Sequence, residues 1–189
     1  MSNLEWLAVA ISALSVWLTV IRTPWCWPVG LLGVTLYAGL FFTVKLYSDA
    51  LLQVIFAVLQ VYGWWQWTRA GSAQHGRQVS VLGGRGIALS LAAGATAAVA
   101  LGTLMAHFTD AEQPWLDAAL TAFSLVAQVW MARKYVQCWP LWLVIDVVYV
   151  GLYVSKALDL TAALYGVFVV LAALGWRQWH AARAPVPAP

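Results

Sequence analysis

The stretch WPLWLVIDVVYVGLYVSK, residues 139–156, decides the fold of this chain. It is 18 residues long and carries one charged residue, Asp146, before the closing Lys156. A helix of this length spans about 27 Å, close to the roughly 30 Å of a bilayer's hydrocarbon core. The stretch therefore predicts a membrane-spanning helix with one carboxylate near its middle.

Six further apolar runs of membrane-spanning length lie around this stretch, and charged residues separate them. We predict seven spans, at 5–22, 28–45, 49–67, 86–106, 116–132, 139–156 and 160–178. The polar stretch 68–85 is rich in Gly, Gln, Ser and Arg and is predicted to be a loop. The Ala- and Pro-rich stretch 180–189 is predicted to be a disordered tail. The predicted fold class is an all-α polytopic membrane protein with seven transmembrane helices.

The composition agrees with a protein of the lipid bilayer. Of the 189 residues, 63% are hydrophobic and only 9% are charged, against roughly 25% charged in a soluble domain. These values exclude a disordered protein, a coiled coil and a disulfide scaffold. The net charge of +3 does not indicate a nucleic-acid partner, because the basic residues are spread along the loops.

The charged residues predict the orientation of the chain in the membrane. Eight of the ten Lys and Arg residues fall on one side of the seven alternating spans, and six of the seven acidic residues fall on the other. Because basic loops stay in the cytoplasm, we expect the N-terminus outside and the C-terminus in the cytoplasm. We expect the first span to be retained rather than cleaved as a signal peptide.

An internal repeat organises the spans. Cys26-Trp27-Pro28 recurs 112 residues later as Cys138-Trp139-Pro140, and 17 of the 42 positions from 26 to 67 are identical in that frame. We therefore predict a first three-helix repeat at 1–67, a loop and linker helix at 68–115 and a second repeat at 116–179. Three spans end on the opposite side from their start, so the linker helix at 86–106 restores the orientation. The prediction is a 3+1+3 arrangement of parallel repeats.

The repeat symmetry breaks most sharply in the sixth span. Trp142 and Asp146 stand where the first copy has Gly30 and Val34. A carboxylate near the bilayer midplane costs several kcal/mol and usually marks a functional site. Helical spacing places it on one face with four aromatic residues of the same span: Trp139, Trp142, Tyr149 and Tyr153. An interhelical hydrogen bond is the alternative role for Asp146.

Two amides break the symmetry in the third span. Gln53 and Gln60 lie seven residues apart on one helical face, where the second copy has Tyr165 and Ala172. Amides inside a bilayer need polar partners, which are either a ligand or a neighbouring helix. Both readings stay open for this pair. Gln128, in the fifth span, is expected to serve in packing.

The remaining aromatic and reactive residues favour structural roles. Tryptophans near span ends are typical interface anchors, and we assign this role to Trp25, Trp27, Trp64, Trp65, Trp67, Trp176 and Trp179. Cys26 and Cys138 map to the cytoplasmic ends of spans, where a disulfide is not expected. His75, His107 and His180 are scattered. We therefore predict no catalytic residues, no metal site and no cofactor.

The candidate residues describe a pocket for a small, flat, polar ligand. The set comprises Trp139, Trp142, Asp146, Tyr149, Gln53 and Gln60. Aromatic faces stack on a ring and attract a cation, a carboxylate pairs with positive charge or accepts from hydroxyls, and amides bind polar edges. A positively charged aromatic ring that carries a sugar would suit this set.

At these residues the chain resembles the PnuC family of bacterial vitamin transporters. The resemblance rests on Trp25-Cys-Trp-Pro28, on the run from Ser48 to Gln53, on Tyr62-Gly-Trp-Trp-Gln-Trp67, and on Trp139-x-x-Trp142-x-x-x-Asp146 followed by Tyr149-x-Gly-Leu-Tyr153. It implies a SWEET-like architecture and a substrate site lined by the tryptophans and the polar residue of the sixth span. Some members carry Asn where this chain has Asp146.

The resemblance also implies a function. It suggests a facilitator in the bacterial inner membrane that imports nicotinamide riboside for NAD synthesis, with trapping by a cytoplasmic riboside kinase. Thiamine is also a cationic aromatic compound, so thiamine transport is the alternative. The partners expected are this small molecule and the lipid bilayer, and a homo-oligomer is compatible with the sequence. The rival classes are an intramembrane enzyme, which would need an acid–base pair, and a structural subunit.

Overall fold

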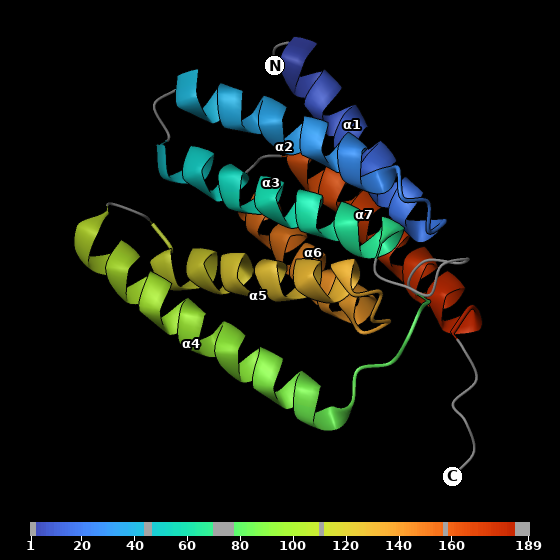
Figure 1. Cartoon of the computed structure of the whole chain (residues 1–189). Helices are drawn as coiled ribbons and strands as arrows, with labels where there is room; N and C mark the ends of the chain where they lie inside the picture. The colour runs from blue at the N-terminus through green and yellow to red at the C-terminus, as the bar shows by residue number, and fades with distance from the viewer. Residues whose placement is uncertain (1–2, 44–46, 70–77, 110–111, 157–158, 184–189) are drawn as a thin grey trace.

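Seven helices make up the fold of the described residues, as the chain-coloured view of the computed structural model shows (Figure 1). The described residues are 3–43, 47–69, 78–109, 112–156 and 159–183. The helices are α1 (Asn3–Val20), α2 (Cys26–Thr43), α3 (Tyr47–Thr68), α4 (Gly84–Phe108), α5 (Pro114–Ala132), α6 (Cys138–Ser155) and α7 (Asp159–Ala181). The predicted all-α fold with seven helices is confirmed, and each predicted span lies almost entirely within one helix.

Length and apolar character make the helices suitable for a bilayer. Within the described residues, four helices are long and apolar enough to cross a membrane: Gly84–Phe108, Pro114–Ala132, Cys138–Ser155 and Thr161–Ala181. Two shorter apolar segments, Val9–Val20 and Cys26–Gly39, belong to α1 and α2. Since α7 continues to Ala181, two residues of the predicted tail are helical, and 184–189 lie outside the described residues.

Six of the helices form a closed ring. Each helix of the ring contacts the next one in the order α1, α2, α3, α5, α6, α7, and α7 contacts α1. The remaining helix, α4, packs along α5 on the outside of this ring (Figure 1). Three glycines or alanines of α4 are buried, Gly94, Ala98 and Gly102, which lets the two helices approach closely. We refer to α1–α3 as the first unit and to α5–α7 as the second unit.

The two units share the same turn after their first helix. Arg22 and Lys134 both take a left-handed conformation, with φ of 62° and 53°. In each turn one amide reaches back five residues, from Thr23 to Leu18 O at 3.0 Å and from Tyr135 to Trp130 O at 2.9 Å. This pattern caps the last carbonyls of a helix. Both turns lie at one end of the bundle, which we call the basic end.

Four buried tryptophans fill the basic end, and we call them the tryptophan cluster. Trp27 packs edge-on against Trp67 with the ring centroids 5.4 Å apart, and Trp139 packs edge-on against Trp179 at the same centroid distance of 5.4 Å. A further contact, between Trp67 and Trp179 at 5.8 Å, joins the two pairs. The indole of Trp67 donates to Ala132 O at 3.1 Å, and that of Trp179 donates to Thr19 O at 3.1 Å. The cluster therefore ties the two units together.

These positions correct part of the sequence interpretation. Trp27, Trp67 and Trp179 are at most 2% exposed, so the prediction that they anchor the chain at the membrane interface is wrong. Their indoles find aromatic neighbours, and two of them find backbone carbonyls, inside the bundle. The four other predicted anchors, Trp25, Trp64, Trp65 and Trp176, are exposed, as an interface role requires.

The segment before α4 is more ordered than a free loop. Ser80 pairs with Tyr135 in an isolated parallel bridge, and the Gln137 amide bonds both the N–H and the carbonyl of Leu82 at 3.1 and 3.0 Å. Val79 is buried in the core. Residues 78–82 thus dock on the connection between α5 and α6, while 70–77 of the predicted loop lie outside the described residues.

A cavity enclosed by six helices

A cavity of about 410 Å³ lies inside the ring of six helices. Side chains from α1, α2, α3, α5, α6 and α7 line it, whereas α4 contributes none of the lining residues. Pockets of about 300 to 1,000 Å³ are typical of sites for small organic ligands. The volume and the enclosure by both units make this cavity the candidate functional site.

All six residues predicted for the site line this cavity. They are Gln53 and Gln60 from α3, and Trp139, Trp142, Asp146 and Tyr149 from α6. The α6 residues follow the helical spacing that places them on one face, because about 3.6 residues make one turn. The fold brings the two sets together although more than 70 residues of sequence separate them.

Asp146 is the carboxylate of the cavity. It is 5% exposed, and within the described residues it has no hydrogen bond or ion pair. None of the residues that line the cavity is Lys, Arg or His. A buried, uncompensated carboxylate is unfavourable, so a cation that entered the cavity would gain from pairing with it. The electrostatics of the site favour a positively charged or hydrogen-donating ligand.

Aromatic rings gather on the same side of the cavity as Asp146. The rings of Tyr149 and Tyr153 stack with their centroids 5.8 Å apart and an interplanar angle of 12°. The ring centroid of Tyr165, from α7, lies 4.7 Å from that of Tyr149 and 5.1 Å from that of Tyr153. Together with Trp142 these rings offer flat, electron-rich faces, which attract aromatic rings and cations. Sequence reasoning did not select Tyr165, although its position is one where the two units differ.

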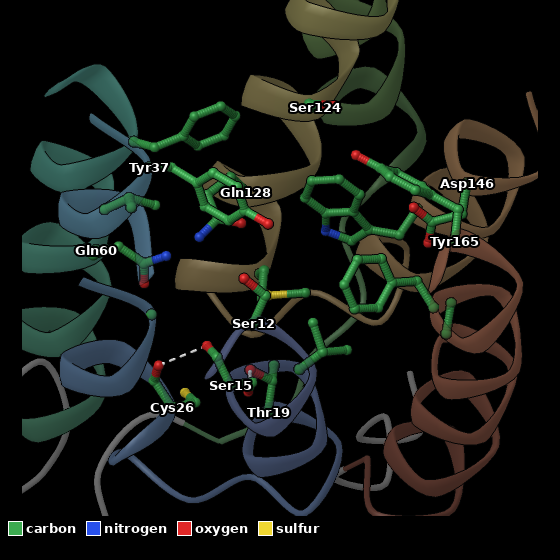
Figure 2. A pocket seen from close by; sticks show the side chains of 18 of the residues that line it. Ser12, Ser15, Thr19, Cys26, Tyr37, Gln60, Ser124, Gln128, Asp146 and Tyr165 are labelled. Atoms are coloured by element: carbon green, nitrogen blue, oxygen red, sulfur yellow. Dashed lines mark hydrogen bonds between the residues drawn. The ribbon is translucent and has the colours of Figure 1, made fainter. Parts of the chain in front are cut away.

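The amides lie on the other side of the cavity. Figure 2 shows Gln60 and Gln128 on one side of the space and Asp146 and Tyr165 on the opposite side. Gln128 is 7% exposed and lines the cavity, so it is placed to do more than the predicted packing. It stands where the first unit has Val16, and this asymmetry could have identified it from the sequence.

Hydroxyl groups and the tryptophan cluster form the basic end of the cavity. Trp27 and Trp139 belong both to that cluster and to the lining. Beside them, Ser15 Oγ donates to Cys26 O at 2.9 Å (Figure 2) and Thr19 Oγ1 donates to Ser15 O at 2.9 Å. Hydroxyls inside membrane helices commonly bond backbone carbonyls in this way, so Ser15 and Thr19 could not be selected from the sequence.

The architecture matches that of a solved transporter. A crystal structure titled as that of the Vitamin B3 transporter PnuC superposes with a TM-score of 0.72, covers 95% of this chain and 83% of its own, and shares 22% identity. At this identity the likeness concerns the fold. The fold defines the chain as an all-helical, multi-pass membrane protein whose helix ring surrounds a cavity.

Sequence relatives identify the family. The profile described as Nicotinamide mononucleotide transporter matches residues 2–181. A nicotinamide riboside transporter PnuC of Escherichia coli strain K12 is 27% identical over 175 residues, which cover 79% of this chain and 73% of the relative. A riboflavin/roseoflavin transporter RibM of Streptomyces davaonensis is 32% identical over 162 residues, covering 84% and 75%. The chain belongs to the PnuC family of vitamin transporters, as its motifs predicted.

Proposed function

We propose that this protein is a facilitator that imports nicotinamide riboside across the bacterial inner membrane. The observation that carries the proposal is the buried Asp146 carboxylate beside stacked aromatic rings in a cavity of about 410 Å³. Nicotinamide riboside combines a flat cationic ring with ribose hydroxyls and an uncharged amide. Each of these groups has a matching side chain among the lining residues.

Each candidate residue has a distinct role in this proposal. Trp142 and Tyr149 stack on the pyridinium ring, and Trp139 closes the cavity beside it. Asp146 pairs with the positive charge or accepts hydrogen bonds from the ribose hydroxyls, since a carboxylate accepts only. Gln53 or Gln60 binds the polar edge of the ring. The ligand thus contacts both units at once.

The charge of the cavity argues for a riboside rather than a phosphorylated nucleotide. The lining contains Asp146 and no Lys, Arg or His. A phosphate group is usually held by Arg, Lys or a helix N-terminus, and a second negative charge beside Asp146 would be repelled. We therefore infer that the riboside is accepted and that the mononucleotide is rejected.

Thiamine is the alternative ligand, because it is also a cationic aromatic compound. Riboflavin, the substrate named for one relative, is uncharged and larger, and a carboxylate in the cavity suits it less well. A panel of these vitamins with nicotinamide riboside and nicotinamide separates the candidates. When all the ligands are used at one concentration, the ligand with the lowest Kd raises Tm the most, because stabilisation grows with the ratio of ligand concentration to Kd. At about 100 times its Kd, a ligand stabilises the folded protein by about 2.7 kcal/mol.

The central test removes the carboxylate and the indole in turn. Asp146→Ala is expected to weaken nicotinamide riboside binding to the purified protein by at least about 30-fold, since loss of one partner of a buried charge pair costs about 2 kcal/mol or more. Trp142→Ala is expected to weaken it by a similar factor, since truncation of a buried aromatic anchor also costs about 2 kcal/mol or more. Asp146→Asn keeps the shape and isolates the charge effect. Val34→Ala, at the equivalent position in the first unit, is the matched control. Affinity at the wild-type level in both test variants would exclude this site.

The transport cycle in this proposal uses the two units as moving parts. The identical turns and tryptophan pairs support reading α1–α3 and α5–α7 as parallel repeats, joined by α4 in a 3+1+3, SWEET-like layout. Rocking of one unit against the other would expose the cavity to either side. The basic loops support a cytoplasmic C-terminus. We propose trapping by a cytoplasmic riboside kinase, with no reaction catalysed by the transporter itself.

A further inference from the structure

Gly30 and Gln60 make an unusually close contact across α2 and α3. A Cβ built on Gly30 would lie 2.7 Å from Gln60 Nε2 and 2.8 Å from Oε1. Gly30 is buried and has helical neighbours on both sides, so its backbone conformation does not require glycine. The reason for a glycine here is space, because the amide of Gln60 rests directly on the α2 backbone.

The second unit reverses the sizes at the equivalent positions. The residues 112 positions further on are Trp142 and Ala172, and all four residues line the cavity. The first unit therefore has a small residue on α2 and a long amide on α3. The second unit has a large indole on α6 and a small residue on α7. The exchange gives the cavity one amide wall and one aromatic wall at the same depth.

We propose that Gly30 is a specificity-determining position because it holds the Gln60 amide against α2, opposite the indole of Trp142. Held there, the amide binds an uncharged amide substituent on the ring that Trp142 stacks. The inference rests on the proposed function in taking this ligand to be an aromatic riboside. Gly30 acts through Gln60 and is itself a positioning residue.

A methyl group at position 30 tests this without removing any polar group. The atoms it would meet are the far end of a flexible side chain, so the Gln60 amide shifts off the α2 backbone and the helices stay packed. Gly33 lies one turn further along α2, and a Cβ there would be 3.4 Å from Ile11 Cγ2 and 3.6 Å from Ser12 Oγ. Gly33→Ala is therefore the matched control on the same helix.

The experiment titrates the purified full-length chain with two ligands. One is nicotinamide riboside, and the other is the pyridinium riboside that lacks the carboxamide. The wild-type protein is expected to prefer the first by about three- to ten-fold, the contribution of a hydrogen bond or two. Gly30→Ala should abolish this preference and change the affinity for the second ligand by less than about two-fold. Gly33→Ala should keep the wild-type preference.

A double variant distinguishes positioning from a general packing effect. If Gly30 acts through Gln60, then Gln60→Ala loses the same preference, and the double variant Gly30→Ala/Gln60→Ala loses nothing further. A wild-type preference in Gly30→Ala, or additive losses in the double variant, would overturn the inference.

The same set of variants separates this inference from the proposed function. If the wild-type protein binds no riboside but binds another vitamin of the panel, the proposed function fails. The Gly30 and Gln60 variants are then titrated with that vitamin, and non-additive losses still support the positioning role, whereas additive losses overturn it. A protein that binds none of the panel overturns both.

Discussion

Equivalent residues of the two units are alike at the basic end of the bundle, but several of them differ in the walls of the cavity. At the basic end, residues 112 apart repeat each other, with the same left-handed turn and the same 5.4 Å tryptophan contacts. In the cavity walls, Gly30 of the first unit corresponds to Trp142 of the second, and Val34 corresponds to Asp146. Matched positions carry the packing of the fold and supply Trp139 and Tyr149 to the cavity, whereas unmatched positions supply its carboxylate and its amides.

The largest expected effect would come from breaking the matched packing. A Cβ at Gly63 would overlap the Trp27 ring, and one at Gly175 would overlap the Trp139 ring. Both rings are nearly inaccessible to solvent, and a rigid indole cannot bend away as the end of a flexible side chain can. We expect Gly63→Ala and Gly175→Ala each to lower the free energy of unfolding by about 2 to 3 kcal/mol. Thermal unfolding of the purified protein measures the loss.

Two further glycines provide the control for this pair. Gly39 and Gly151 also occupy equivalent positions, and a Cβ at either would meet nothing within 4 Å. Alanine at these positions should leave the stability unchanged or raise it by about 0.5 to 1 kcal/mol, since glycine weakens a helix interior. A loss confined to Gly63→Ala would show that the two units do not share this packing.

A smaller effect is expected from removing the indole donors that join the units. Trp67→Phe and Trp179→Phe keep a ring and delete the N–H that bonds a carbonyl of the other unit. Each should lower the free energy of unfolding by about 1 kcal/mol, the usual contribution of one hydrogen bond. Trp65→Phe, at a half-exposed position, is the control for ring size. Strongly unequal losses at 67 and 179 would contradict the matched arrangement.

The smallest effect concerns a polar contact between α3 and the end of α5 that the equivalent residues of the other unit cannot make. Tyr62 Oη accepts hydrogen bonds from Arg133 Nε at 3.1 Å and from Gln66 Nε2 at 2.9 Å, while the equivalent of Tyr62 in the second unit is Leu174. Because Arg133 is exposed, Tyr62→Phe should cost only about 0.5 kcal/mol. If Tyr62→Phe lowered the free energy of unfolding as much as Trp67→Phe, the packing of α3 against α5 would depend on this polar contact.

The sequence was most informative where chemistry and periodicity coincide. Apolar runs between charges located all seven helices, because a bilayer allows few other structures. Asp146 was found because a carboxylate is rare at mid-depth. Gln53, Gln60 and Trp142 followed from the broken symmetry, and the rest of the aromatic face of α6 followed from its helical spacing with Asp146. All of these side chains line one cavity.

Long-range contacts were beyond the reach of the sequence. A tryptophan near a span end looks the same whether it faces lipid or a neighbouring helix, so Trp27, Trp67 and Trp179 were assigned to the wrong environment. Gln128 and Tyr165 enter the cavity only because α5 and α7 close the ring. The docking of 78–82 on the α5–α6 connection combines a backbone bridge with hydrogen bonds from the Gln137 amide, and no periodic sequence pattern marks such a contact.

The order of contacts around the ring has a consequence for biosynthesis. Most neighbours in the ring are consecutive in the chain or separated by α4 alone, so they can pack soon after synthesis. The contact between α1 and α7 is different, because it joins the first of these seven helices to the seventh. Until α7 leaves the ribosome, the aromatic wall lacks Tyr165 and the ring stays open. A nascent chain that lacks α7 therefore has no closed cavity, and ligand binding in the cavity would report that α7 has packed.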